Sequence, residues 1–267
     1  MILETQGLTK NFGGIKALNG VDLRLRKGEL AGLIGPNGSG KTTVFNVITG
    51  IYRPDRGTVT METKRIAGLA PHRISRLGIA RTFQNIRLFR NLSVLDNVRT
   101  AYHPKVSYGP VSAVCRTKKY LEGEKEIGEN VTELLSLFSL QDRKWELAKN
   151  LSYGDQRRLE IARALASEPK ILLLDEPAAG MNPSEVAKMM EFILEVRRRF
   201  RLTILLIEHQ MRLVMGICER LVVMDFGEVI AEGSPSEIRK DPRVIEAYLG
   251  RRVSSRYVTD IMKWSDR

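Results

Sequence analysis

Residues 30–43 read Leu30-Ala31-Gly32-Leu33-Ile34-Gly35-Pro36-Asn37-Gly38-Ser39-Gly40-Lys41-Thr42-Thr43, an apolar run followed by a glycine-rich segment. The apolar residues 30–34 predict a buried strand, and the pattern after Gly40 predicts a helix up to Gly50. Between them, Gly35-x-x-x-x-Gly40-Lys41-Thr42 matches the pattern of a phosphate-binding loop. A strand, a glycine loop and a helix in this order indicate an α/β fold built around a bound polyphosphate.

The residue types of this loop suit that chemistry. Glycines let several backbone N–H groups turn toward one anion, and a helix that begins near Lys41 presents the positive end of its dipole to the same place. We expect Lys41 to reach the β- and γ-phosphates of a nucleotide and the Thr42 hydroxyl to bind Mg²⁺. The alternative is a glycine-rich turn ahead of a core helix, and the preceding strand argues against it.

A second apolar run ends in two carboxylates. Ile171–Leu174 predicts a buried strand, and Asp175 and Glu176 follow at its carboxyl end, where α/β sheets place ligands. Asp175 suits a Mg²⁺ ligand, and Glu176 suits a general base for an attacking water. His209 follows another predicted strand, Thr203–Ile207, so its imidazole is placed to bond the γ-phosphate or to orient Glu176.

Strand and helix patterns alternate along most of the chain, and this alternation predicts a mostly parallel sheet covered on both faces. The segment from about residue 85 to 152 differs because its pattern is helical, which indicates an insertion between two halves of a strand-rich core. The helices predicted within it are Ser93–Ala101, Leu121–Phe138 and Asp142–Lys149. The first 30 residues predict two short strands, Ile2–Leu8 and Leu18–Leu25, around a Gly13-Gly14 turn.

Composition narrows the class of protein. The net charge of +12 would suit a nucleic acid or an acidic membrane surface. The basic residues are scattered, however, and aromatic residues make up only 6% of the chain, so we expect no nucleic acid partner. The apolar runs are far shorter than a membrane span, and the two isolated cysteines fit a reducing compartment. We expect a cytoplasmic chain without a targeting leader.

The chain resembles the ATP-binding-cassette (ABC) ATPases along nearly its whole length. The most specific motif is Leu151-Ser152-Tyr153-Gly154-Asp155-Gln156, which looks like the signature loop of that family. Gln84 matches the glutamine of the Q-loop, and Phe12, ahead of Ala17, lies where the family has an aromatic that stacks on adenine. Residues 178–182 fall where the family has its D-loop, and His209 falls where it has its switch histidine.

This resemblance implies a fold, a mechanism and a site. The fold is a P-loop NTPase core with a mainly parallel sheet, an N-terminal antiparallel β subdomain and an inserted α-helical subdomain. Two such chains sandwich two ATP molecules, each between the P-loop of one chain and the signature loop of the other. The nucleotide-binding residues implied are Phe12, Ala17, Gly35, Pro36, Asn37, Gly38, Ser39, Gly40, Lys41, Thr42, Thr43, Gln84, Ser152, Gly154, Asp175, Glu176 and His209. Of these, Lys41, Gln84, Glu176 and His209 would be catalytic, and Thr42, Gln84 and Asp175 would bind Mg²⁺.

Three residues depart from the family pattern. Tyr153 replaces the first glycine of the signature, Asp155 replaces a glutamine and so places a negative charge near a polyphosphate, and Asn182 replaces the aspartate of the D-loop. If the chain pairs with a different subunit, these changes would weaken one of the two composite sites.

A finer resemblance is to the ATPase subunits of branched-chain amino acid importers. It is carried by residues 78–89, by the signature loop, by residues 176–183 and by the closing run 225–250. It implies a peripheral protein on the cytoplasmic face of the cell membrane. Its partners would be two permease subunits, a second related ATPase or a homodimer mate, and an extracytoplasmic solute-binding protein. A groove beside Gln84, with Phe89, Arg87 and Arg90, would receive a permease helix.

The resemblance also implies how the chain divides into domains, and it leaves alternative functions open. Residues 1–250 would form the ATPase domain, with the helical insertion at about 85–152, and residues 251–267 a basic tail near acidic lipid. Lipopolysaccharide export and urea or amide uptake are alternative transport functions. A soluble ABC ATPase acting on nucleic acid would need a long coiled coil, and Lys41 and Asp175 are only 134 positions apart. A GTPase would need an Asn-Lys-x-Asp motif, which the sequence lacks.

Overall fold

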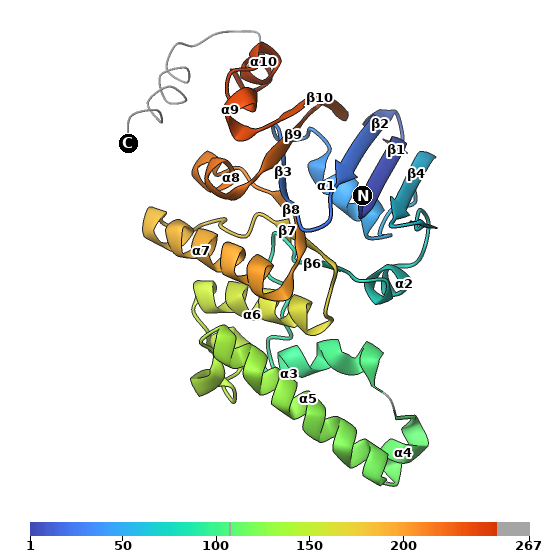
Figure 1. Cartoon of the computed structure of the whole chain (residues 1–267), viewed down its shortest axis with the longest axis vertical. Helices are drawn as coiled ribbons and strands as arrows, with labels where there is room; N and C mark the ends of the chain where they lie inside the picture. The colour runs from blue at the N-terminus through green and yellow to red at the C-terminus, as the bar shows by residue number, and fades with distance from the viewer. Residues whose placement is uncertain (107, 250–267) are drawn as a thin grey trace.

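The β3 strand, Leu30–Ile34, lies near the middle of a six-stranded sheet in the computed structural model, which describes residues 1–106 and 108–249. The strand order is β10-β9-β3-β8-β7-β6, and every described pair is parallel except β9 with β10. A second, four-stranded sheet has the order β2-β1-β4-β5, and its described pairs are antiparallel. Figure 1 shows this smaller sheet beside the main one, with the helices between residues 94 and 137 at the opposite end.

The strands are β1 Leu3–Phe12, β2 Ile15–Leu25, β3 Leu30–Ile34, β4 Arg56–Met61, β5 Lys64–Arg65, β6 Ile79–Arg81, β7 Ile171–Asp175, β8 Thr203–Ile207, β9 Arg220–Asp225 and β10 Glu228–Gly233. The helices are α1 Lys41–Ile48, α2 Pro71–Arg76, α3 Val94–Arg99, α4 Pro110–Val114, α5 Lys118–Leu137, α6 Tyr153–Ala166, α7 Pro183–Phe200, α8 Met211–Ile217, α9 Pro235–Ile238 and α10 Pro242–Leu249. Three 3₁₀ turns, Thr100–Lys105, Gln141–Arg143 and Ala148–Asn150, complete the described elements.

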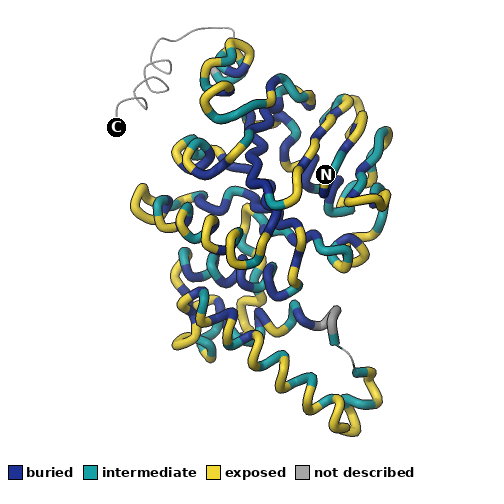
Figure 2. Tube along the Cα trace, in the orientation of Figure 1, coloured by how far each residue is buried: buried dark blue, intermediate teal, exposed yellow. Residues whose placement is uncertain are grey.

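Two hydrophobic cores cover the two faces of the main sheet. Along β3, Leu30 and Ile34 point into one core and Ala31 and Leu33 into the other, as the alternation of a strand requires. The first core also includes residues of α6, α7 and α8, and the second includes α1 and the antiparallel sheet. Figure 2 shows the central strands buried along their length. The predicted α/β class with a mainly parallel sheet is therefore confirmed.

The N-terminal hairpin is longer than its apolar residues suggest. β1 runs to Phe12, which pairs with Ile15 across the predicted Gly13-Gly14 turn. We expected β1 to stop at Leu8, because the residues after it are polar. Asp55 accounts for the extension, since it binds the Lys10 ammonium at 2.9 Å and accepts a hydrogen bond from the Asn11 amide at 2.6 Å.

The helix predicted at Asp142–Lys149 is wrong. In its place two 3₁₀ turns flank a segment whose backbone bonds to the chain ahead of α3. The Val94 amide donates to Glu146, the Ala148 amide donates to Leu92, and Ser93 forms a β-bridge with Leu147. The segment's backbone groups are therefore used by another segment, and a periodic side-chain pattern carries no information about such a partner. The prediction of helices at Ser93–Ala101 and Leu121–Phe138 agrees with α3 and α5.

The two cysteines differ in burial, and we predict that they differ in reactivity. Burial raises the pKa of the Cys218 thiol to about 12, whereas Cys115 is exposed. Only the thiolate attacks an alkylating reagent, so at pH 8 roughly one Cys218 thiol in ten thousand would be reactive. Iodoacetamide should label native protein once, at Cys115, as measured by peptide mass spectrometry. Cys115→Ser should remain unlabelled until it is unfolded, and stoichiometric labelling of native Cys218 would contradict the structure.

Candidate nucleotide site

The glycine loop joins β3 to α1 in a conformation that only glycine permits at two positions. Gly35 has φ of +148°, and a Cβ there would lie 2.0 Å from the Met224 carbonyl oxygen. Gly40 has φ of +101°, and a Cβ there would lie 2.6 Å from the Ala17 carbonyl oxygen. The loop is therefore packed tightly from β9 and from β2, and its shape is that of a preformed anion cradle.

The loop residues differ in exposure as a phosphate site would require. Gly35, Ser39 and Lys41 are buried; Pro36, Gly40 and Thr43 are half-buried; and Asn37, Gly38 and Thr42 are exposed. The last three are therefore accessible to a ligand.

Lys41 folds back over the loop. Its Nζ donates to the carbonyl oxygens of Gly35 at 2.8 Å and Pro36 at 2.7 Å, and to Ser39 Oγ at 3.1 Å. Burial lowers the pKa of the Lys41 ammonium, while the carboxylates of Glu176 and Asp175 act in the opposite direction. A partly desolvated cation held among carbonyls has much to gain from an incoming phosphate oxygen.

Glu176 lies between Gln84 and His209. Gln84 Nε2 donates to Glu176 Oε2 at 2.8 Å, and His209 Nε2 lies 3.0 Å from Glu176 Oε1. The three residues follow β6, β7 and β8, which are neighbours in the sheet, so parallel pairing brings them to one edge. Glu176 has φ of +48°, a left-handed conformation that few non-glycine residues adopt. The sequence-predicted residues therefore meet around one carboxylate.

Asp175 is buried and forms an ion pair that the sequence did not reveal. Its Oδ2 accepts from Arg81 Nη2 at 2.7 Å, and Arg81 Nη1 donates to Asn46 Oδ1 at 2.6 Å. Arg81 thus ties β7 to β6 and to α1 directly below the phosphate loop. The position of Arg81 within β6 gave no signal, because arginines are frequent in this chain and most of those within the described residues are exposed.

Glu208 is a second buried carboxylate that sequence reasoning missed. Its side chain is 1% exposed and accepts hydrogen bonds from the amides of Ala178 at 2.8 Å, His209 at 2.8 Å and Gln210 at 3.1 Å. Gln210 returns a bond from Nε2 to the Ala178 carbonyl at 2.8 Å. The segment after Glu176 and the segment that carries His209 are therefore held together by one anion. The only sequence signal for this role was that Glu208 directly precedes His209, a histidine at the end of a predicted strand.

We predict that Glu208→Gln weakens hydrolysis more than ATP binding. A carboxamide turns an N–H₂ group toward at least one of the three amides, so a buried bond is lost at a cost of about 1–3 kcal/mol in unfolding free energy. Misplacement of His209 should lower turnover on the order of tenfold or more. Urea unfolding and turnover at saturating ATP measure the two effects. The exposed Glu195→Gln is the matched control, and wild-type turnover in Glu208→Gln would refute a positioning role.

The signature loop forms the amino end of α6. Ser152 caps the helix, since its Oγ accepts from the Asp155 amide at 3.2 Å and donates to Asp155 Oδ2 at 2.8 Å. Asp155 itself is buried and paired with Arg143, at 3.0 Å, and with Arg158. We expected Asp155 to bring negative charge near a polyphosphate; instead two arginines neutralise that charge within the chain.

The other two departures also have structural partners. Asn182 caps α7 and accepts from the amides of Ser184 and Glu185, each at 3.0 Å. The Glu185 carboxylate in turn accepts a hydrogen bond from the Asn182 amide at 2.9 Å, which completes a capping box. The Tyr153 side chain is 47% exposed, and its hydroxyl accepts a bond from Arg157 at 3.2 Å. Ser152 is exposed and Gly154 half-buried beside it.

Phe12 stands at the end of the hairpin, 42% exposed. Its ring meets Tyr52 edge-on at 5.0 Å, and Lys10 Nζ lies 5.5 Å from its centre. Ala17, on β2, lies against Gly40 of the loop, as described above. An accessible aromatic ring on the strand pair that borders the loop is compatible with the predicted stacking on adenine.

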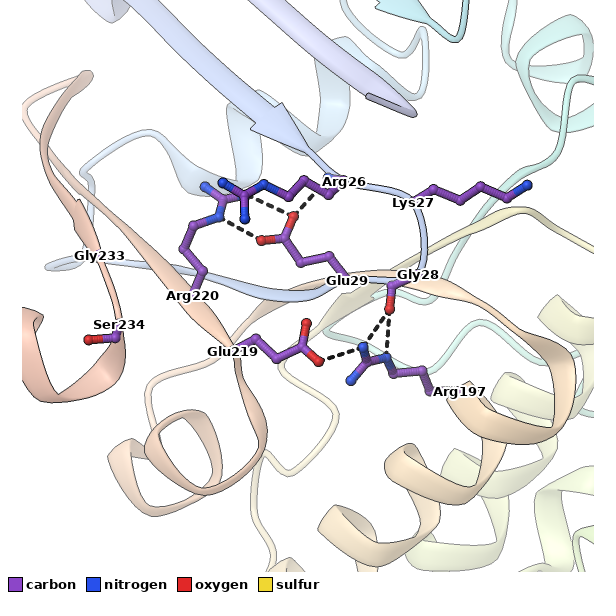
Figure 3. A pocket seen from close by; sticks show the side chains of 9 residues that line it. All are labelled: Arg26, Lys27, Gly28, Glu29, Arg197, Glu219, Arg220, Gly233 and Ser234. Carbon is purple, nitrogen blue, oxygen red and sulfur yellow. Dashed lines mark hydrogen bonds and ion pairs between the residues drawn. The ribbon is translucent and has the colours of Figure 1, made fainter.

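The described residues also line two hollows, one beginning at His209 and one away from the site. A cleft of about 1020 Å³ begins at His209 and continues between α7, α8 and the two C-terminal helices. A pocket of about 400 Å³ lies at the other end of the strands, beside Glu29, which precedes β3. Figure 3 shows that two of its arginines already have side-chain partners: Arg197 donates to the Gly28 carbonyl at 2.9 Å and pairs with Glu219 at 2.6 Å, and Arg220 pairs with Glu29 at 2.6 Å. This pocket is remote from the phosphate loop and is held together by its own ion pairs.

Comparison with known proteins identifies the class. The family model for ABC transporters matches residues 18–179, and a model for branched-chain amino acid ATP-binding cassette transporters matches residues 228–254. The solved ADP-bound form of MJ1267, an ATP-binding cassette of an ABC transporter, has a TM-score of 0.81 and 35% identity, over 94% of this chain and 99% of that one. The chain belongs to the ABC transporter family of ATP-binding cassettes, as its motifs predicted.

Within that family, the chain is similar to high-affinity branched-chain amino acid transport ATP-binding proteins. It is 47% identical to LivG of Salmonella typhimurium over 249 residues, which are 93% of this chain and 98% of LivG. It is 43% identical to BraF of Pseudomonas aeruginosa over 249 residues, with the same coverage of both chains. These relatives confirm the predicted resemblance to the ATPase subunits of branched-chain amino acid importers.

Proposed function

We propose that the chain is the ATP-hydrolysing subunit of an importer for branched-chain amino acids. The observation that carries the proposal is the Glu176 carboxylate, held by Gln84 and His209 at the edge of the sheet where the phosphate loop ends. The substrate class comes from the relatives, which are named for branched-chain amino acid transport. None of the relatives reported above is named for lipopolysaccharide export or urea uptake.

The chain's own groups suit an in-line attack by water. Lys41 and the loop amides would bind and neutralise the β- and γ-phosphates. Glu176 would accept the proton of the attacking water, while Gln84 and His209 keep its two oxygens in place. Because each oxygen of Glu176 already has a partner, the carboxylate needs little reorganisation when a water arrives.

The donor set also fits Mg²⁺, which would supply positive charge to neutralise the charge of the nucleotide. Thr42, Gln84 and Asp175 supply a hydroxyl, an amide and a carboxylate, and such hard oxygen ligands suit this ion. Among the described residues, no group of three or more His, Cys, Asp or Glu side chains is placed to hold a metal. A Mg²⁺ site completed by phosphates needs only one or two carboxylates, so the two observations agree.

We also propose that the working unit contains two cassettes. Ser152 is exposed and Gly154 half-buried at the amino end of α6, where the helix dipole favours a bound anion. The solved MJ0796, an ABC transporter cassette, is a dimer and is also known with ADP and Pi; it shares 26% identity and a TM-score of 0.74 with this chain. A second cassette, of the same or a related chain, would bring its phosphate loop to Ser152 and Gly154.

Permease subunits would dock beside Gln84. Phe89 is 53% exposed, and its backbone is held by the buried Asn97, whose Oδ1 accepts from the Phe89 amide at 2.9 Å. Arg163 lies over the ring at 5.5 Å. A fixed apolar side chain among arginines suits a short helix of a membrane protein. No helix within the described residues is long and apolar enough to cross a bilayer. In the proposed importer, the chain would bind permease subunits at the cytoplasmic face of the membrane, and a solute-binding protein would act on the outside.

We predict that Glu176→Gln binds ATP but hydrolyses it about 10²- to 10⁴-fold more slowly, because the amide cannot accept the water's proton. ATP should then hold two cassettes together, and light scattering should show ATP-dependent doubling of mass. Glu195→Gln, an exposed residue of α7, should behave as wild type. Wild-type turnover in Glu176→Gln would remove this residue from the base role.

We predict that cells lacking this chain lose uptake of radiolabelled leucine, isoleucine and valine. The wild-type gene should restore uptake and Lys41→Ala should not, because the variant lacks the phosphate-binding ammonium. Two further measurements in the same strain test the alternative transport functions. Urea uptake tests urea or amide import, and resistance to detergents, which a damaged outer membrane admits, tests lipopolysaccharide export. Intact amino acid uptake together with loss of either of these would overturn the proposed substrate class.

A further inference from the structure

Arg157 is a buried cation with an unusual set of partners. Its side chain is 1% exposed, one turn into α6. Nη1 donates to the Phe83 carbonyl at 2.6 Å and to Glu160 at 3.1 Å, and Nη2 donates to the Gln84 carbonyl. One guanidinium therefore grips two consecutive peptide units of the segment that carries Gln84.

Glu160 extends this grip. Its side chain is 2% exposed, and while one oxygen accepts from Arg157, the other accepts from the Arg87 amide at 3.0 Å. The pair thus holds residues 83–87 to α6 at three backbone positions. An extended loop has few other interactions that fix it to a helix. This pair therefore determines the position of the Gln84 backbone relative to α6.

The pair lies between two functional ends of the chain. Toward the amino end of α6, Arg157 also donates to the Tyr153 hydroxyl at 3.2 Å, inside the signature loop. In the other direction, the Gln84 side chain bonds Glu176 at 2.8 Å. A continuous chain of contacts therefore runs from the signature loop, through Arg157, to the carboxylate proposed as the base.

The energetics argue that this pair does more than stabilise the fold. A buried ion pair carries a desolvation penalty, and an apolar pair of similar volume is often as stable or more stable. Nε of Arg157 is buried with no hydrogen-bond partner in the described part of the chain, which adds to that penalty. The forked geometry of the guanidinium does supply something an apolar pair cannot, which is a directional hold on two carbonyls.

We propose that Arg157 and Glu160 are positioning residues that couple the two ATP sites of the dimer. The inference rests on the proposed function, since the signature loop of one cassette must engage the nucleotide of the other. When nucleotide draws Ser152 and Gly154 toward the partner, α6 moves as a rigid element and pulls the carbonyls of Phe83 and Gln84 with it. The Gln84 side chain then moves relative to the Glu176 carboxylate. Closure of one ATP site therefore positions the general base of the other ATP site.

The test uses the transporter complex with its membrane subunits and the paired variant Arg157→Met with Glu160→Leu. Replacing both partners avoids an unpaired buried charge. ATP hydrolysis is measured against ATP concentration. Wild type should show a Hill coefficient approaching about 2, the number of coupled sites. The paired variant should show a coefficient near 1 and at least a tenfold lower turnover, with ATP affinity within about twofold of wild type.

Arg197→Met is the matched control. Arg197 also binds a backbone carbonyl, that of Gly28, and a carboxylate, that of Glu219, but it lies at the opposite end of the strands. It should keep wild-type cooperativity and turnover. Arg157→Lys serves if the paired variant does not fold, because it keeps the charge and loses the fork. It should lower the Hill coefficient in a protein that still unfolds in a cooperative thermal transition.

The coupling role would be overturned if a folded paired variant showed wild-type cooperativity and turnover. If the paired variant does not fold, the same result in Arg157→Lys would overturn it. An equal loss of cooperativity in Arg197→Met would overturn it as well. Wild type that hydrolyses ATP with a Hill coefficient of 1 would refute the coupling and leave the proposed function standing. Absence of hydrolysis in wild type would instead refute the proposed function.

Discussion

The parallel pairing of β7 with β8 is the interaction on which the site depends. The register pairs Asp175 with Ile207, and the Glu176 amide continues the ladder by donating to the Ile207 carbonyl at 2.8 Å. Glu176 and His209 therefore leave adjacent strands at the same edge. A shift of this register by one residue would turn every side chain of the strand to the opposite face. The two apolar cores resist such a shift because each accepts only one set of side chains.

Buried charges link this edge to the rest of the molecule. The Arg81–Asp175 pair, Glu208 and the Arg157–Glu160 pair each lie between two segments that are distant in sequence, whereas Lys41 binds carbonyls of its own loop. Each is costly to bury, and its partners are backbone carbonyls, backbone amides or side chains of complementary charge or polarity. Hydrophobic packing would hold the same segments together with less directional control. The charged contacts fix the relative placement of loops that must act on one phosphate.

Sequence reasoning succeeded where function requires particular residue types at short spacing. Gly35 and Gly40 had to be glycine because β9 and β2 leave no room for a Cβ. Reasoning failed where a residue acts through a distant partner. The helix predicted at Asp142–Lys149 is absent because that backbone bonds to residues 92–95. The pairing of Asp155 with Arg143 and Arg158 was likewise not foreseen from the sequence.

The sequence by itself determined the phosphate loop, the acidic strand end, the signature and the family, because each is encoded by neighbouring residues whose chemistry is local. Only the tertiary structure decided which groups meet. That Glu176 has both Gln84 and His209 as partners, and that Glu208 joins two loops, follows from the order of the strands in the sheet. The grip of Arg157 on the Gln84 segment likewise depends on helix packing across more than seventy residues of chain. Hydrogen bonds over such separations depend on three-dimensional proximity, which no local pattern specifies.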